Sequence, residues 1–411
     1  MRTITGSAIT LHVLFLLLGP LPFSLSTQAV GTPFLVGTAQ VEITPPLGLA
    51  MSGWSHREHG ATGIDDPLYL QAMVLSDGAD TVALITADII NWPREQVLEI
   101  RRRVNLDTGI DPDHLMVSAS HTHFGPDLGK KTAWLSNLPA WAAGAVRMAV
   151  DNMAPALIDA GVGAAPGLGY NRRGRAPDGS ISMVWHHPPP EGHRLVGPVD
   201  NSVGVIRIDS ETGHPLAVLF NFAVHPVCNE DRFYDYSADY PGVARDLIES
   251  VVGGQAFFTL GTHGDINPVA RREGAKRKTG VGLGAEVVRI WASLEPSDAG
   301  KIAAANRMVK LPLKEPTAVN QHLETEVQVL RLGNNFLVGL PGEILVRIGQ
   351  TIKEKAGRPN VFVTDVTNDH ISYVPGREEF PIEGYEVGRS RVAPGADEIL
   401  VRTALQLIQN L

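Results

Sequence analysis

The feature that most constrains this chain is a short apolar run, rich in β-branched residues, that recurs along the sequence and ends each time in polar residues. Three of the runs lead directly into histidine-bearing segments, at His121, His225 and His263. Runs of this length and composition are typical of buried strands. The six predicted strands cover residues 81–86, 115–120, 216–224, 256–260, 336–340 and 361–366.

Amphipathic helical patterns separate these runs. The alternation predicts an α/β fold in which a mixed, largely buried β-sheet is flanked by helices. In open α/β sheets, sites form beyond the carboxyl ends of the strands. We therefore expect His, Asp and Glu residues that are distant in sequence to meet at one edge. The predicted helices cover residues 94–104, 138–152, 240–252, 281–293, 344–356 and 396–409.

The first thirty residues are typical of an export signal. Arg2 gives a positive start, an apolar segment covers residues 9–23, and small residues lead to a cleavage point after Ala29. The apolar segment is too short, and too interrupted by Gly and Pro, to span a bilayer comfortably. We expect residues 1–29 to be a signal peptide and residues 30–411 to form one soluble domain that is exported to the periplasm or the medium.

Charge and cysteine content exclude other classes of protein. The chain has 35 basic and 44 acidic residues, a net charge of -9, and no long run of one sign, which argues against a nucleic-acid partner. A lone cysteine, Cys228, excludes an internal disulfide and is expected to be a small buried residue. The segment 170–198, rich in Gly, Pro, Arg and His, is predicted to be a long excursion or lid rather than a linker.

The clearest local motif is His121-Thr122-His123. In an extended backbone the two imidazoles would point to the same side, which suits a metal or a substrate, although two histidines satisfied by neighbouring carbonyls are an equally good explanation. Each of three further residues also has a purely structural explanation. His225 could be a strand-end histidine, Glu343 a helix cap and Tyr373 a core tyrosine. Together with a histidine of the pair they make a plausible zinc set with room for water, whose pKa zinc lowers to about 7.

Motifs along nearly the whole chain resemble the N-terminal catalytic domain of neutral, non-lysosomal ceramidases. One of them would mean little, but this many in order is specific. The resemblance implies a single ceramidase-like catalytic domain over residues 30–411, without the C-terminal β-sandwich domain that ceramidases carry. The motifs include residues 37–46 (GTAQVEITPP), 120–126 (SHTHFGP), 221–226 (NFAVHP), 264–268 (GDINP), 340–343 (LPGE) and 384–386 (GYE).

The resemblance also implies which residues form the site. One zinc ion per chain would be held by four residues, namely His121, His225, Glu343 and Tyr373. His123, Arg172 and Tyr385 would face the substrate, although an exposed loop cation is an equally good explanation of Arg172. The expected activity is zinc-dependent hydrolysis of the C–N amide bond of a small-molecule or lipid N-acyl substrate, with sphingolipids among the candidates.

Two positions depart from the family pattern. Asn267 stands where ceramidases have a serine essential for activity, and an amide can orient water or polarise a carbonyl but cannot act as a nucleophile. His370 replaces a tyrosine, and His263 is an additional imidazole that could serve as a proton carrier. An esterase on the same fold, a binding protein without turnover and a dinuclear metallophosphoesterase remain alternatives, although the last needs an Asp-x-His motif that the expected position lacks.

Overall fold

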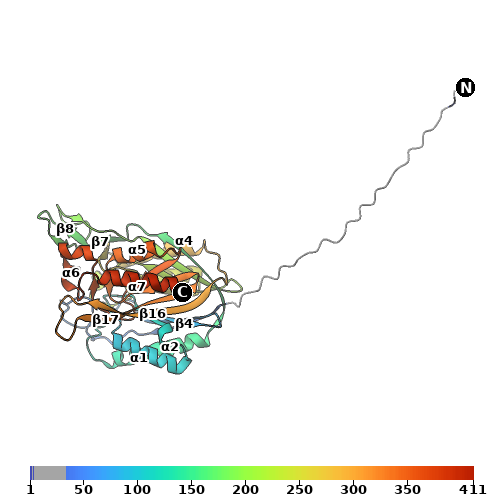
Figure 1. The fold of residues 1–411 in the computed structure, drawn as a ribbon, viewed down its shortest axis with the longest axis horizontal. Coiled ribbons are helices and arrows are strands. Elements are labelled where there is room, and N and C mark those ends of the chain that lie inside the picture. The colour runs from blue at the N-terminus through green and yellow to red at the C-terminus, as the bar shows by residue number, and fades with distance from the viewer. Residues whose placement is uncertain (2, 4–33) are drawn as a thin grey trace. The chain divides into compact units, whose positions relative to one another are not determined.

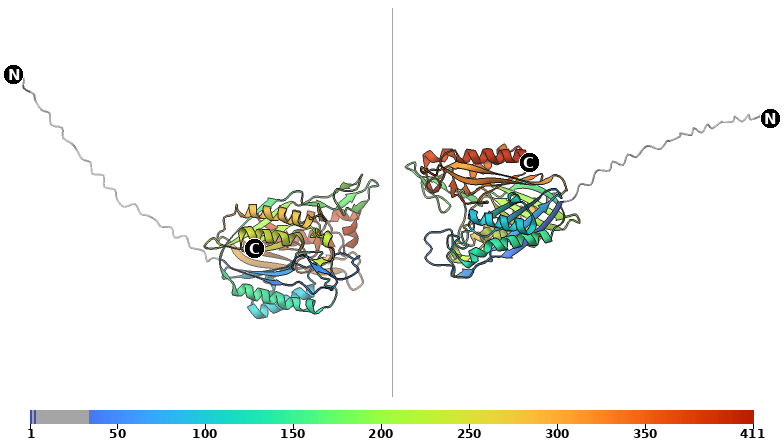
Figure 2. Two further views of the ribbon diagram at one scale, coloured as in Figure 1. Left: turned by 180° about the vertical axis from the view of Figure 1, so that it is seen from behind. Right: turned by 60° about the horizontal axis from the view of Figure 1, so that its bottom comes forward.

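Two β-sheets lie face to face between outer helices. The computed structural model describes Met1, Thr3 and residues 34–411, and in the part from residue 34 onward helices, sheet, sheet and helices follow as four layers (Figures 1 and 2). The predicted signal peptide, apart from Met1 and Thr3, lies outside the described residues. The prediction of a mixed sheet flanked by helices is confirmed, but the sequence did not indicate that a second sheet packs on the first.

The larger sheet is parallel at both edges and antiparallel in the middle. Strands β12 and β14 pair in parallel at one edge and β4 and β5 at the other, while the strands between them run antiparallel. In spatial order the strands are β14 (Gln255–Leu260), β12 (Pro215–Phe222), β11 (Ser202–Ser210), β6 (Ala154–Ala164), β1 (Phe34–Glu42), β3 (Tyr69–Ser76), β4 (Thr81–Ala87) and β5 (Leu115–Ala119).

Four helices cover one face of the larger sheet. Their buried side chains join those of the strands in one hydrophobic cluster, which includes Cys228 as the sequence predicted. The second helix begins five residues earlier than predicted because the Thr132 hydroxyl caps it by accepting a hydrogen bond from the backbone N–H of Leu135. The helices are α1 (Arg94–Thr108), α2 (Ala133–Asp151), α3 (Asp239–Val252) and α4 (Ala275–Trp291).

The smaller sheet packs against the other face of the larger one. Its side chains Ile302, Leu330, Leu337 and Phe362 enter the cluster between the sheets, and its outer face is covered by α5 (Val346–Lys355) and α7 (Ala396–Asn410). Figure 2 shows α7 outside the smaller sheet. In spatial order its strands are β16 (Lys301–Pro312), β17 (His322–Gly333), β18 (Asn335–Gly339) and β20 (Val361–Thr364).

The segment that follows β20 joins both edges of the larger sheet. The backbone N–H of Asp365 donates to the carbonyl of Leu260 at the end of β14, over 3.0 Å, and that of Asn368 donates to Val117 of β5, over 2.8 Å. The carboxyl ends of strands from both sheets are thereby brought to one place. The expectation that polar strand ends meet is confirmed by this arrangement.

The excursion over residues 170–198 forms a small sheet of its own and is tied to the chain near the strand ends. Strand β7 (Gly169–Asn171) pairs with β15 (Ile266–Pro268), and the three-stranded sheet projects beside α6 (Tyr385–Arg389) in Figure 1. No helix of the described residues combines the length and apolar character needed to cross a bilayer. The remaining elements are β8 (Arg173–Arg175), β9 (Ile181–Met183), β10 (Arg194–Leu195), β2 (Gly63–Ile64), β13 (Asp235–Tyr236), β19 (Glu343–Ile344) and β21 (Tyr373–Val374), with 3₁₀ helices at Pro112–His114, Glu230–Arg232 and Arg377–Ile382.

Candidate metal centre

Four buried side chains gather where the strands end. One ring nitrogen from each of His121, His225 and His263 and one carboxylate oxygen of Glu343 all lie within 4.8 Å of one another. The histidines follow β5, β12 and β14 of the larger sheet, whereas Glu343 follows β18 of the smaller sheet. The group therefore spans the two sheets.

The backbone at His121 is not extended as predicted. His121 lies beyond the end of β5 with φ 62°, in the left-handed region, and its N–H donates to the carbonyl of Ile89 over 3.0 Å. The prediction that an extended strand would present the His-Thr-His motif is wrong, because the chain turns at this residue. The imidazoles of His121 and His123 are still neighbours, with ring centroids 5.0 Å apart.

Each of the three clustered histidines uses Nδ1 for a hydrogen bond within the protein. Nδ1 of His121 lies 2.6 Å from the carbonyl oxygen of Ile90, Nδ1 of His225 lies 3.0 Å from that of Ile266, and Nδ1 of His263 lies 2.8 Å from Oδ2 of Asp365. The Nε2 atoms of His121 and His263 are buried and have no hydrogen-bond partner among the residues that the structure describes. A histidine that ligates a metal commonly has its second nitrogen fixed in this way.

The electrostatics of the group favour neutral imidazoles at His225 and His263 beside a charged carboxylate. Burial lowers the pKa of both His225 and His263 well below the usual range. Burial alone would raise the pKa of Glu343, but the histidines around it hold that pKa well below the usual value, with His121 the largest contributor. Oε2 of Glu343 lies 3.3 Å from Nε2 of His225 and 3.5 Å from Nε2 of His121.

These observations fit a borderline-soft divalent cation. Neutral imidazole nitrogens and a carboxylate oxygen are the donors that zinc accepts, and the two partnerless Nε2 atoms gain a partner if a cation lies between them. The buried, charged carboxylate of Glu343 would also be compensated by a cation. The side chains present therefore fit a metal ion, and the donor types include those of catalytic zinc sites.

Arg172 is buried beside this group rather than exposed in a loop. Its guanidinium donates to Oε1 of Glu386 over 2.8 Å, to the hydroxyl of Tyr373 over 3.1 Å and to Oδ1 of Asn267 over 3.3 Å. The alternative of an exposed loop cation is wrong, because β7 and β15 hold the segment against the strand ends. The Nδ2 group of Asn267 is buried and has no hydrogen-bond partner in the described part of the chain.

A small inner cavity adjoins these residues. It encloses about 40 Å³ and is lined by His123, Asn267, Tyr373 and Tyr385 among others. Both ring nitrogens of His123 are shielded from solvent and have no partner, and burial lowers the pKa of this imidazole well below the usual range. His123 is thus placed next to both the histidine cluster and the space that a substrate group could enter.

Two buried acids lie beside the histidine cluster and Arg172, although the sequence did not indicate them as site residues. Asp365 contacts His263, and Glu386 pairs with Arg172. Asp365 sits inside the apolar run 361–366, and an acid embedded in such a run is the signal that could have identified it. His370 also reaches the group, with Nε2 3.5 Å from Oε1 of Glu343.

Comparisons with known proteins agree with this arrangement. The model of the family described as neutral/alkaline non-lysosomal ceramidase, N-terminal, matches residues 34–268. The solved structure of neutral ceramidase from Pseudomonas aeruginosa is similar with a TM-score of 0.77 at 18% identity, covering 92% of this chain and 75% of that chain. A ceramidase complexed with C2 is similar with the same TM-score and identity, covering 92% and 76%.

Proposed function

Because this chain belongs to the neutral/alkaline non-lysosomal ceramidase family, we propose that it is a zinc-dependent amidohydrolase that cleaves the C–N amide bond of an N-acyl substrate with water. The observation that supports this most directly is the ring of three histidines. Each has Nδ1 engaged within the protein and offers one ring nitrogen to a group, completed by the charged carboxylate of Glu343, whose ligand atoms lie within 4.8 Å of one another. That is the donor set that one catalytic zinc ion needs.

We propose His121, His225 and Glu343 as three ligands of one zinc ion per chain. The family resemblance implies the Tyr373 oxygen as the fourth, and the geometry adds a competitor in His263, whose Nε2 lies in the same group. The hydroxyl of Tyr373 accepts a hydrogen bond from Arg172, so it is held as an oxygen donor beside Glu343. When bound, zinc would polarise the substrate carbonyl and lower the pKa of the attacking water.

The protein's own groups have distinct roles in this proposal. Arg172 and the free Nδ2 group of Asn267 stabilise the negative charge that develops on the carbonyl oxygen when water adds to the carbonyl carbon. His123 accepts the proton that the attacking water loses and delivers it to the leaving amine as the C–N bond breaks, and Tyr385 steadies the substrate at the cavity mouth. Asn267 acts as a donor and not as a nucleophile, so the proposal extends to N-acyl compounds other than ceramide and to esters.

Metal analysis of purified variants tests the proposal. We expect one zinc per wild-type chain, a large loss of zinc in His225→Ala, and retained zinc with loss of turnover in His123→Ala, the matched control from the same cluster. The fourth ligand is identified by comparing the zinc affinities of Tyr373→Phe and His263→Ala in competition with a chelator. The variant with the larger loss of affinity lacks the ligand.

Two outcomes would contradict the proposal in different ways. Unchanged zinc content in His225→Ala would remove the metal site. A wild-type protein that holds zinc but cleaves neither N-acyl nor ester substrates across a broad panel would instead support a binding protein on this fold.

A further inference from the structure

The inner cavity adjoins a much larger outer chamber, with which it shares part of its wall. The outer chamber has a volume of about 540 Å³, within the usual range for small-molecule sites, whereas the inner cavity has about 40 Å³. The two are lined in common by Gly53, Trp54, Trp185, Arg271 and Tyr385. A substrate whose amide reaches the inner cavity must therefore leave its remaining groups in the outer chamber.

The outer chamber is cationic on an acidic protein. It is lined by Arg271, Arg272 and Arg389 and by a single acid, Glu230, while the whole chain has a net charge of -9. Glu230 pairs with both Arg271, over 2.6 Å, and Arg272, over 3.0 Å. One carboxylate cannot neutralise three guanidinium groups, so the chamber keeps an excess of positive charge that would attract an anion.

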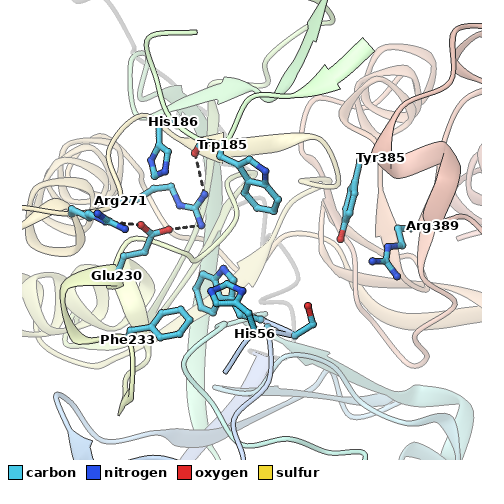
Figure 3. Close-up of a pocket in the computed structure, with 12 residues that line it drawn as sticks. His56, Trp185, His186, Glu230, Phe233, Arg271, Tyr385 and Arg389 are labelled. Atoms are coloured by element: carbon cyan, nitrogen blue, oxygen red, sulfur yellow. Dashed lines mark hydrogen bonds and ion pairs between the residues drawn. The ribbon is translucent and has the colours of Figure 1, made fainter. Parts of the chain in front are cut away.

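Arg389 is the cation that has no acid to pair with. Its side chain makes no hydrogen bond or ion pair with any residue that the structure describes, and its guanidinium lies 5.5 Å from the centre of the Tyr385 ring. Arg172 lies 5.7 Å from the same ring centre. Tyr385 therefore has a buried arginine, Arg172, and an exposed arginine, Arg389, near its ring, and Figure 3 shows Tyr385 and Arg389 as neighbours in the wall of the chamber.

Aromatic side chains form much of the remaining wall. Trp185, with 47% of its surface exposed, lies across the chamber from Phe233 in Figure 3, and Trp54 packs on Phe233 with ring centroids 5.2 Å apart. The guanidinium of Arg271 is fixed under Trp185 by a hydrogen bond to that residue's carbonyl, over 3.0 Å. Such walls accept an apolar or aromatic group on a substrate that also bears a charge.

We propose that the substrate is an N-acylated amino acid or a close analogue, with a carboxylate that Arg389 binds in the outer chamber and an apolar side chain that packs on Trp54, Trp185 and Phe233. This proposal rests on the proposed amide hydrolysis and narrows its substrate class. A neutral long-chain lipid would leave the excess charge of the chamber without a partner and would place apolar chains against arginines. Arg389 thus determines specificity and takes no part in breaking the bond.

A pair of substrates that differ only in charge tests this. N-acetylphenylalanine and N-acetylphenylalaninol share the acyl group, the amide and the ring, but only the first has a carboxylate. We expect the zinc-loaded enzyme to prefer the acid by about tenfold in kcat/KM at low salt, the usual contribution of a charge-assisted hydrogen bond, and to lose this preference as ionic strength rises.

Variants of Arg389 locate the effect. We expect Arg389→Gln to abolish the preference for the acid by lowering kcat/KM for the acid far more than for the alcohol, and Arg389→Lys to restore part of the preference. Arg358→Gln is the matched control, because Arg358 is also an exposed arginine over an aromatic ring, Phe336, but lines neither chamber. Its preference should equal that of the wild type.

A binding measurement that needs no turnover distinguishes failure of this substrate proposal from failure of the proposed hydrolase activity. Quenching of tryptophan fluorescence by the two compounds reports on the outer chamber even in the His123→Ala variant. Equal affinity for acid and alcohol, or a preference that survives Arg389→Gln, would overturn the proposal. The proposal would also be overturned if Arg389→Gln kept the preference for the acid but no longer sedimented with phosphatidylglycerol vesicles. Arg389 would then bind lipid head groups rather than a substrate carboxylate.

Discussion

Among single residues, Asp239 is a carboxyl group that folding places in an unusually unfavourable position. It is fully buried at the start of α3, with φ 59° in the left-handed region that Asn and Asp tolerate better than most residues. Its Oδ2 accepts a hydrogen bond from the backbone N–H of Cys228 over 2.7 Å. Burial outweighs this bond and raises the pKa of Asp239 to about 7.

Asp239 should make the folded protein less stable as pH rises. Between the ordinary aspartate pKa of 3.8 and a folded pKa of about 7, the folded chain binds a proton that the unfolded chain has released, so the free energy of unfolding falls as pH increases. From pH 5 to pH 8 this contribution is on the order of 2 kcal/mol. We expect denaturant titrations at several pH values to show this fall in the free energy of unfolding in the wild type, and a smaller fall in Asp239→Asn.

The comparison of slopes is needed because other groups titrate in the same range. Glu379 also has a pKa raised to about 7 by burial, and it is present in both proteins, so its contribution cancels. Asp239→Asn keeps a side chain that tolerates left-handed backbone and removes the titration. It also removes one of the two oxygens that accept the backbone N–H groups of Cys228 and Tyr240, but that loss does not depend on pH and leaves the comparison of slopes intact. If wild type and variant lost stability in parallel across this range, Asp239 would not be the group responsible.

For single residues, the sequence indicated candidate site residues that directly follow an apolar run. It did not indicate a site residue that lies inside such a run. His121, His225 and Glu343 were recognisable because a polar residue directly after a buried strand tends to lie at a site. Asp365 was not, because it lies within a run assigned as strand to residue 366. The buried state of Arg172 depends on its contact with Glu386, far along the chain, which no local pattern contains.

Among the elements, the two loops that bear His263 and Glu343 cross at van der Waals contact. The backbone N–H of Gly264 donates to the carbonyl of Ile344 over 2.9 Å. A Cβ atom at Gly264 would lie 2.8 Å from the carbonyl oxygen of Glu343 and 2.9 Å from the carbonyl carbon of Ile344. Only glycine lets the loop after β14 approach the loop after β18 this closely.

Gly264→Ala should push these loops apart and weaken metal binding. Overpacking of this kind costs about 1–3 kcal/mol of stability, and the displaced backbone moves His263 away from Glu343. We expect a lower melting temperature and a zinc affinity reduced by at least about tenfold in competition with a chelator. Gly144→Ala in α2, where a Cβ atom meets nothing within 4 Å, is the control and should keep wild-type zinc affinity. Equal affinities would show that the crossing does not position the ligands.

The elements that the sequence predicted are those with continuous apolar runs. Strands β4, β5, β12, β14, β18 and β20 are largely buried along their length and were recognised. Strand β6 was not, since its burial alternates and it contains Pro155, Asp159 and two glycines. An alternating strand that gains its stability from neighbours on both sides gives a weak local signal.

In the whole molecule, the candidate ligands connect the two sheets. His121, His225 and His263 belong to the larger sheet and Glu343 to the smaller one, so a cation between them would hold the layers together. A ligand that binds only the folded state stabilises it by about 4 kcal/mol when present at a thousand times its dissociation constant. The sequence could not predict this link, because it gave no sign that two sheets stack.

Removal of the metal should therefore lower thermal stability. We expect a chelator such as dipicolinate to lower the melting temperature of the wild type by several degrees, and added zinc to restore it. In His225→Ala the chelator should have no effect, since that variant has already lost its metal. An unchanged wild-type melting temperature, with zinc shown to be removed, would mean that the ion does not hold the layers together.

The separation of these residues along the chain also bears on how the protein reaches its native state. More than half of the polypeptide lies between His121 and Glu343, so closing the ring of ligands requires a contact of very long range. We expect such a contact to form late, after the two halves have each begun to condense. Until Glu343 has been synthesised and docked, a nascent chain could offer a cation only the imidazoles of this group, so firm capture of a metal would be a final step of maturation.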